Sequence, residues 1–158
     1  MIQNEHVEEL DTERLLIKWR WLCPQILTAI DGNEFGDLFL RDEEGRVHML
    51  NVGSGEFTLI AESISEFKER SRTHEMQEEW FAASAVRLAR EHGLLPGHKQ
   101  CIGFSTPVVF AESGGLDSAY IADLYEHVAF LGDIHRQIAN LPDGAKVRLV
   151  VKKPAGDF

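Results

Sequence analysis

The chain has 158 residues, of which 44% are hydrophobic and 27% charged, the proportions of an ordinary globular domain. Its 16 Lys and Arg residues against 26 Asp and Glu residues give a net charge of −10. Nucleic acids and anionic membranes are bound through basic residues, so this balance argues against direct binding to either and favours a basic protein partner. We expect a single domain over residues 1–158, with flexible ends at 1–5 and 152–158.

Two features of the sequence bear on the compartment of the protein. Residues 1–13 contain five acidic residues and no Lys or Arg, unlike the basic start of a signal peptide. The longest apolar runs, such as Thr106 to Ala111, are far too short to cross a bilayer. We therefore expect a cytoplasmic protein with no membrane partner.

The first elements are predicted to be helical. Apolar residues from Val7 to Trp19 recur at roughly helical spacing among charges, and Pro24 ends the pattern. A second short helix is predicted from Pro24 to Ile30, ended by Asp31-Gly32-Asn33.

Residues 35–60 have the sequence pattern of an antiparallel meander. They contain three short β-prone runs separated by Gly-containing turns: Phe35 to Leu40, Arg46 to Val52 and Glu56 to Ile60. Runs of this length joined by such turns are typical of consecutive hairpins.

Helical signals return after the meander. Ser63-Ile64-Ser65-Glu66 forms a capping box that predicts a short helix. A longer helix is predicted over about residues 75–91, with Gly93 at the position of a left-handed C-cap.

The C-terminal third predicts strands and a helix. Strands are expected near residues 100–104 and 118–125, followed by a helix near 126–140 and an edge strand over 145–151. The chain is thus predicted to be an α+β domain. The meander sheet is expected to continue with the strands near 100–104 and 118–125. The helices near 75–91 and 126–140 are expected to cover the apolar face of this sheet. The expected core residues are Phe35, Leu38, Leu40, Trp80, Phe104, Leu131 and Ile134.

The sequence contains no complete catalytic, nucleotide or metal motif, so we expect no enzyme activity and no cofactor. The glycines of Asn51-Val52-Gly53-Ser54-Gly55 flank a single serine, as in a hairpin turn rather than a phosphate loop. His127 and His135 lie eight residues apart on one helix face, too far for a zinc pair. Ser113 and Ser118 lack the Gly-x-Ser-x-Gly elbow of a hydrolase. Cys23 and Cys101 are expected to be reduced and buried.

Two groups of acidic residues are candidates for contact with a partner. The first, Asp42, Glu43 and Glu44, lies in a predicted hairpin turn, and the second, Glu75, Glu78 and Glu79, lies in the first turns of a predicted helix. Solvated acids are common at both kinds of position, and the helix dipole favours them at helix starts. The same residues would also form an acidic docking surface.

Four segments resemble, in order, the Tdi-type immunity proteins of bacterial type VI secretion systems, a family also called GAD-like. The segments span about residues 15–147. They are Trp19, Trp21, Leu22 and Pro24; Phe35-Gly36-Asp37-Leu38-Phe39-Leu40-Arg41-Asp42 with Gly45, Val47 and Leu50; Gln100-Cys101-Ile102-Gly103-Phe104 with Pro107; and Leu131-Gly132-x-x-His135-x-Gln137-Ile138 closing on Leu141-Pro142-x-Gly144.

This resemblance implies a protein that binds the toxic domain of a secreted effector, a DNase in the family's named example, and blocks its activity. After Pro107 the chain departs from the family pattern, which continues with a second Pro and a Leu-Gly-Gly segment. The divergent loop, with Val108, Phe110, Glu112 and Ser113, is the second candidate for partner contact.

Two other functions remain open from the sequence. A ligand-binding or enzymatic module would require a cavity with converging polar groups such as Gln100, His127 and His135. A housekeeping interaction or regulatory subunit would differ from an immunity protein in lacking an effector gene beside its own.

Overall fold

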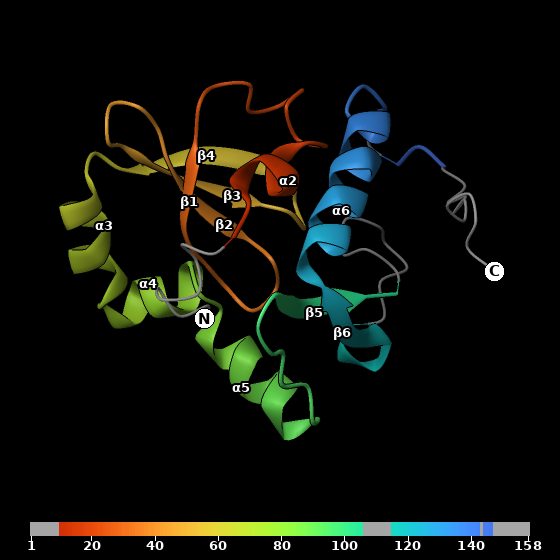
Figure 1. Ribbon diagram of the computed structural model, residues 1–158. Helices are drawn as coiled ribbons and strands as arrows, with labels where there is room; N and C mark the ends of the chain where they lie inside the picture. Colours follow the sequence, from red (N-terminus) through yellow and green to blue (C-terminus); the bar gives the residue numbers. More distant parts are fainter. Residues whose placement is uncertain (1–9, 106–114, 143, 147–158) are drawn as a thin grey trace.

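The computed structural model describes residues 10–105, 115–142 and 144–146 (Figure 1). It is an α+β fold, as the sequence predicts, with a four-stranded sheet, a separate two-stranded sheet and helices around them. The elements are α2 (Thr12–Leu16), β1 (Thr28–Gly32), β2 (Leu38–Arg41), β3 (Val47–Asn51), β4 (Glu56–Ala61), α3 (Ile64–Ser71), α4 (His74–Glu79), α5 (Ala83–Glu91), β5 (Gln100–Phe104), the 3₁₀ helix η1 (Gly115–Ser118), β6 (Ala119–Asp123) and α6 (Leu124–Ile138). The predicted ends at 1–5 and 152–158 and most of the predicted edge strand over 145–151 lie outside the described residues.

The larger sheet is an antiparallel meander in the order β1-β2-β3-β4. Its β2, β3 and β4 confirm the predicted meander, although β2 starts at Leu38 rather than Phe35. The prediction of a helix over residues 24–30 is wrong, because Thr28 to Gly32 forms strand β1 and pairs with β2. A short apolar run carries no periodicity that separates helix from strand, and here pairing with β2 decides the outcome.

The prediction that the strands near 100–104 and 118–125 extend the meander is wrong. These strands, β5 and β6, form their own antiparallel hairpin, in which Ile102 pairs with Ile121. The backbone N–H of Ile102 donates to the carbonyl of Glu34, 2.7 Å away, in the turn that follows β1. This backbone hydrogen bond joins the hairpin to the turn that follows β1, and among the described strands β5 pairs only with β6.

Both faces of the meander are buried, rather than one. Leu38 and Leu40 point to one face and Phe39 to the other, as alternation along a strand requires. On the first face a large cluster includes Trp19, Val128 and Ile134, from the N-terminal segment and α6. On the second face Phe67, Met76, Trp80 and Phe81 pack against Phe39, and Figure 1 shows α3 and α4 there, across the sheet from α6.

The predicted helix over residues 75–91 is interrupted, forming α4 and α5. Trp80 and Phe81 are each only 3% exposed, and both rings contact Phe39, with centroid distances of 6.3 and 5.0 Å. Neighbouring residues of one helix point about 100° apart, so a continuous helix would not bury both rings on one site. Ala82 takes a left-handed conformation at the break, and the Glu78 carboxylate accepts hydrogen bonds from the Ser84 N–H and hydroxyl at the start of α5.

The segment that follows α2 packs closely on α6. The Trp19 indole N–H donates to the Val128 carbonyl at 2.8 Å. A Cβ at Gly132 would lie 2.6 Å from the Lys18 carbonyl oxygen, so only glycine allows this approach. Five of the seven predicted core residues are buried, whereas Phe35 and Phe104 are partly exposed.

Replacing Leu40 by Ala should lower the free energy of unfolding by about 2–5 kcal/mol, because the side chain is fully buried and leaves a cavity. The same change at Leu59, which is 45% exposed on β4, is the matched control and should cost less than about 1 kcal/mol. Urea denaturation of both variants measures the difference. Equal losses would contradict the burial of this face of β2.

Candidate functional site

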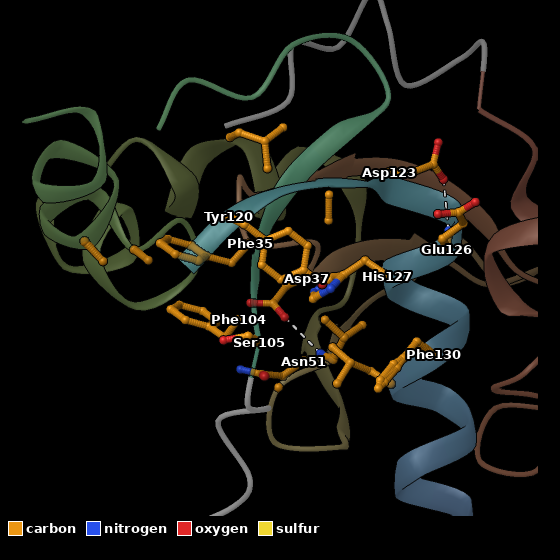
Figure 2. Close-up of a pocket in the computed structure, with 17 residues that line it drawn as sticks. Phe35, Asp37, Asn51, Phe104, Ser105, Tyr120, Asp123, Glu126, His127 and Phe130 are labelled. Atoms are coloured by element: carbon orange, nitrogen blue, oxygen red, sulfur yellow. Dashed lines mark hydrogen bonds between the residues drawn. The ribbon is translucent and has the colours of Figure 1, made fainter. Parts of the chain in front are cut away.

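A cavity of about 810 Å³ lies where the β1–β2 turn and the β3–β4 turn meet β6 and the first turns of α6 (Figure 2). The rings of Phe35, Phe104, Tyr120 and Phe130 form much of its wall. Its polar lining comes from Asp37, Asn51, Ser105, Asp123, Glu126 and His127. The two predicted core residues that are not buried, Phe35 and Phe104, therefore line a cavity, and their parallel rings stack with centroids 6.1 Å apart.

The turn that carries Phe35 and Asp37 is held by the buried amide of Asn33. The Asn33 Oδ1 accepts from the backbone N–H of Phe35 at 3.0 Å and of Asp37 at 3.1 Å. Its Nδ2 donates to the Trp80 carbonyl at 3.0 Å and to Asp37 Oδ2 at 2.8 Å. An Asx-type turn with every amide position used fixes where Phe35 and Asp37 point.

Asp37 is a buried carboxylate in the wall of the cavity, and Figure 2 shows it between Phe104 and His127 in this view. Besides the bond from Asn33, its Oδ1 accepts from the Val52 N–H at 2.9 Å. Burial raises the pKa of the Asp37 carboxyl, while hydrogen bonds from Asn33, Val52 and Gly53 partly oppose the rise. These partners are all neutral donors, so they satisfy the oxygens without balancing a negative charge.

The His127 ring is seated between two glycines. A Cβ on Gly36 would lie 3.0 Å from its Cδ2, and a Cβ on Gly103 would lie 3.1 Å from its Nδ1. Gly36 also has φ of +90°, which favours glycine. Burial lowers the pKa of His127, opposed by a hydrogen bond with the backbone of Phe35, so the ring is neutral at physiological pH.

Of the three polar residues expected to converge in a ligand-binding module, one lines the cavity. His127 does so, whereas the exposed Gln100 accepts a hydrogen bond from the Gly97 N–H at 2.8 Å. His135 lies beneath the β3–β4 turn, where its Nε2 is 3.0 Å from the Val52 carbonyl and 3.1 Å from the Gly53 carbonyl.

The structure places the first acidic group in the β2–β3 turn, but the Asp42 carboxylate is buried and forms hydrogen bonds within the fold. Its side chain is 4% exposed and accepts from the Arg46 Nε at 3.0 Å and the His48 Nε2 at 2.8 Å. The hydrogen bond with His48 is the main cause that holds the pKa of Asp42 well below its usual range. Glu43 and Glu44 are exposed, and Glu44 pairs with Arg46 at 3.5 Å.

The second acidic group shares one face of α4, since Glu75, Glu78 and Glu79 are three and four residues apart. Glu75 and Glu79 are exposed, whereas Glu78 binds the start of α5 through Ser84. Trp80, which follows α4, reaches Asn33 at the opposite end of the strands from the Asp42 turn. The two acidic groups lie on different elements, the β2–β3 turn and α4.

The described residues hold no cluster of three His, Cys, Asp or Glu side chains able to bind a metal ion. Cys23 and Cys101 are free and buried, as predicted, and burial raises their pKa values to about 11 and about 12. Both thiols are protonated at neutral pH and are poor nucleophiles. The second-choice contact residues Val108, Phe110, Glu112 and Ser113 lie outside the described residues. Within the described ranges, no helix is long and apolar enough to span a membrane.

No family model and no curated protein matches the chain. The resemblance to the Tdi-type immunity proteins thus depends on the four segments alone. Residues from three of them, including Phe35, Phe104 and Leu131, line the cavity.

Sequence reasoning missed Asn33 and Asp37 as site residues. The signal that could have found them is local: an Asn followed by Gly36 and an Asp at the fourth position is typical of a side-chain-stabilised turn. Their partners Trp80 and Val52 give no such signal, because each lies in a different element.

Replacing His135 by Gln should change the pH dependence of stability in a defined direction. Burial lowers the pKa of His135 in the folded protein, so the unfolded chain binds the proton more readily. The stability that depends on the neutral ring is present above about pH 6.5 and is lost as the pH falls below that value. The advantage of wild type over His135→Gln in urea denaturation should therefore shrink between about pH 7.5 and about pH 5.

His74→Gln, at the exposed first residue of α4, provides the reference for the same change outside the interior. A difference between wild type and His135→Gln that stays constant over this pH range would contradict a buried, neutral imidazole.

Proposed function

We propose that this protein is a non-enzymatic binding domain that neutralises the nuclease-like toxin of a type VI secretion effector in the cytoplasm of the cell that makes it. The observation that carries the proposal is the resemblance of four ordered segments to the Tdi-type immunity proteins. The net charge of −10 gives independent physical support.

Electrostatic attraction connects the charge to this partner. A nuclease is basic where it binds phosphate, so an acidic protein approaches that groove faster than chance collision allows. Exposed acids on the inhibitor then also take the place of the phosphates. Such an inhibitor needs no cofactor and no chemistry of its own.

The exposed members of the two acidic groups are the proposed contacts. These are Glu43 and Glu44 in the β2–β3 turn and Glu75 and Glu79 on α4. Asp42 and Glu78 also belong to the groups, but their carboxylates accept hydrogen bonds within the fold. Mutagenesis of the interface should therefore leave Asp42 and Glu78 unchanged.

Reversing the charge of the contact acids should slow association with the toxin encoded beside this protein. Two double variants, Glu43→Lys with Glu44→Lys and Glu75→Lys with Glu79→Lys, each change the net charge from −10 to −6. At low salt, the variant that alters the interface should associate about tenfold more slowly and with weaker salt dependence, because rim charges act on encounter. Stopped-flow or surface-binding kinetics measure both effects.

Glu69→Lys with Glu91→Lys is the matched control, since both residues are exposed and the net charge again becomes −6. If cells expressing the neighbouring toxin survive no better with the wild-type protein than without it, the proposed function is wrong. If protection survives both test variants and their association rates equal that of the control, the interface lies elsewhere.

A second candidate function, binding of a small molecule, is favoured by the cavity between β6 and α6. Its volume of about 810 Å³ falls in the range of ligand sites, and it combines aromatic walls with a few polar groups.

A further inference from the structure

The cavity has the dimensions of a site for a free small molecule. Its volume of about 810 Å³ is several times that of one amino-acid side chain. Sites of this kind bury most of a ligand against apolar walls and orient it through a small number of polar groups. A ligand with an apolar body of its own fills such a space better than a single Lys or Arg side chain from a partner.

The charge of the lining indicates the sign of the ligand's charge. Among the described residues that line the cavity, three are carboxylates, Asp37, Asp123 and Glu126, and none is Lys or Arg. His127 is the one further titratable base of this lining, and desolvation lowers the pKa of its partly buried ring, so the ring adds no positive charge at neutral pH. The charged side chains of this lining would repel an anion and attract a cation.

The aromatic walls point to the same class of ligand. Phe35, Phe104, Tyr120 and Phe130 surround the space, and the negative face of an aromatic ring attracts a cation within about 6 Å of its centre. Phe35 and Phe104 come from different elements but lie parallel, so this wall is built before any ligand arrives.

Asp37 supplies the polar anchor. Its oxygens accept from Asn33 at 2.8 Å, from Val52 at 2.9 Å and from the Gly53 N–H, and a carboxylate has about four acceptor positions in all, so about one remains. A buried carboxylate surrounded by neutral donors is costly unless a cation joins it. A ligand ammonium or guanidinium group at Asp37 would offset part of that cost.

We propose that this cavity is a binding site for a small organic cation, a protonated amine or guanidinium attached to an apolar body, held by Asp37 and by the rings of Phe35, Phe104 and Tyr120. The site is independent of the proposed neutralisation of a toxin and can exist with or without it.

Three probes that share one body and differ in charge test the proposal: tryptamine, its neutral alcohol analogue indole-3-ethanol, and the anion indole-3-acetate. Tryptamine should bind the full chain, with a Kd below about 1 mM, at least about tenfold more tightly than either analogue. In ¹⁵N-correlated NMR spectra the amide shifts should centre on Phe35, Phe104 and Tyr120. Calorimetry or NMR titration gives the affinities.

Asp37→Asn, which keeps the size of the side chain, should weaken tryptamine binding about tenfold or more and leave indole-3-ethanol unaffected. If that variant does not fold, Tyr120→Ala replaces it, because Tyr120 is 48% exposed and its loss should weaken binding without unfolding the protein. Glu91→Gln removes one negative charge from an exposed position on α5 away from the lining, so it controls for a general effect of net charge and should bind like wild type.

Equal affinity for the three probes, no binding of tryptamine at about 10 mM, or shifts centred outside the cavity would each overturn the proposal. So would binding of an Arg-containing peptide in the absence of any tryptamine binding, because the cavity would then receive a protein side chain.

Discussion

The buried amide of Asn33 is the contact on which the arrangement of the site depends. It lies at the end of β1 and joins the β1–β2 turn to the residue that follows α4, through hydrogen bonds with Phe35, Asp37 and Trp80. A buried amide without these partners would cost several times what one hydrogen bond contributes, so the segments are held together as a unit. The turn thereby directs Phe35 and Asp37 to the cavity, while Trp80 stays over the second face of the meander.

A second set of polar contacts holds the β3–β4 turn from both sides. The Val52 N–H donates to Asp37, and the Val52 carbonyl lies 3.0 Å from the Nε2 of His135 on α6. One residue thus connects the β1–β2 turn to the C-terminal helix. Where side chains interdigitate, the interior of a protein leaves few voids. At this end of the meander, hydrogen bonds hold the turns and α6 together, and the space between them is a cavity that side chains do not fill.

The sequence predicted those elements whose stabilising contacts are local. Ser63 caps α3 through the Glu66 N–H, and Gly93 has the expected positive φ after α5. Two predictions failed for different reasons. The break after α4 exists because Trp80 and Phe81 both pack on Phe39, which lies far outside any window around α4. Strand β1 pairs with the neighbouring β2, but its short apolar run carries no periodicity that separates strand from helix.

The candidate site was less predictable than the fold, because the sequence shows how many charged residues there are but not which groups neutralise each of them. Asp37 and Asp42 lie in one segment, and both are buried. The register of β2 with β3 brings Arg46 and His48 to Asp42, so that carboxylate finds its cation inside the fold. Asp37 lies at the other end of β2, where its hydrogen-bond partners Asn33 and Val52 are neutral. A cation from outside would therefore gain more at Asp37, within the cavity, than at the hairpin turn that charge alone had favoured.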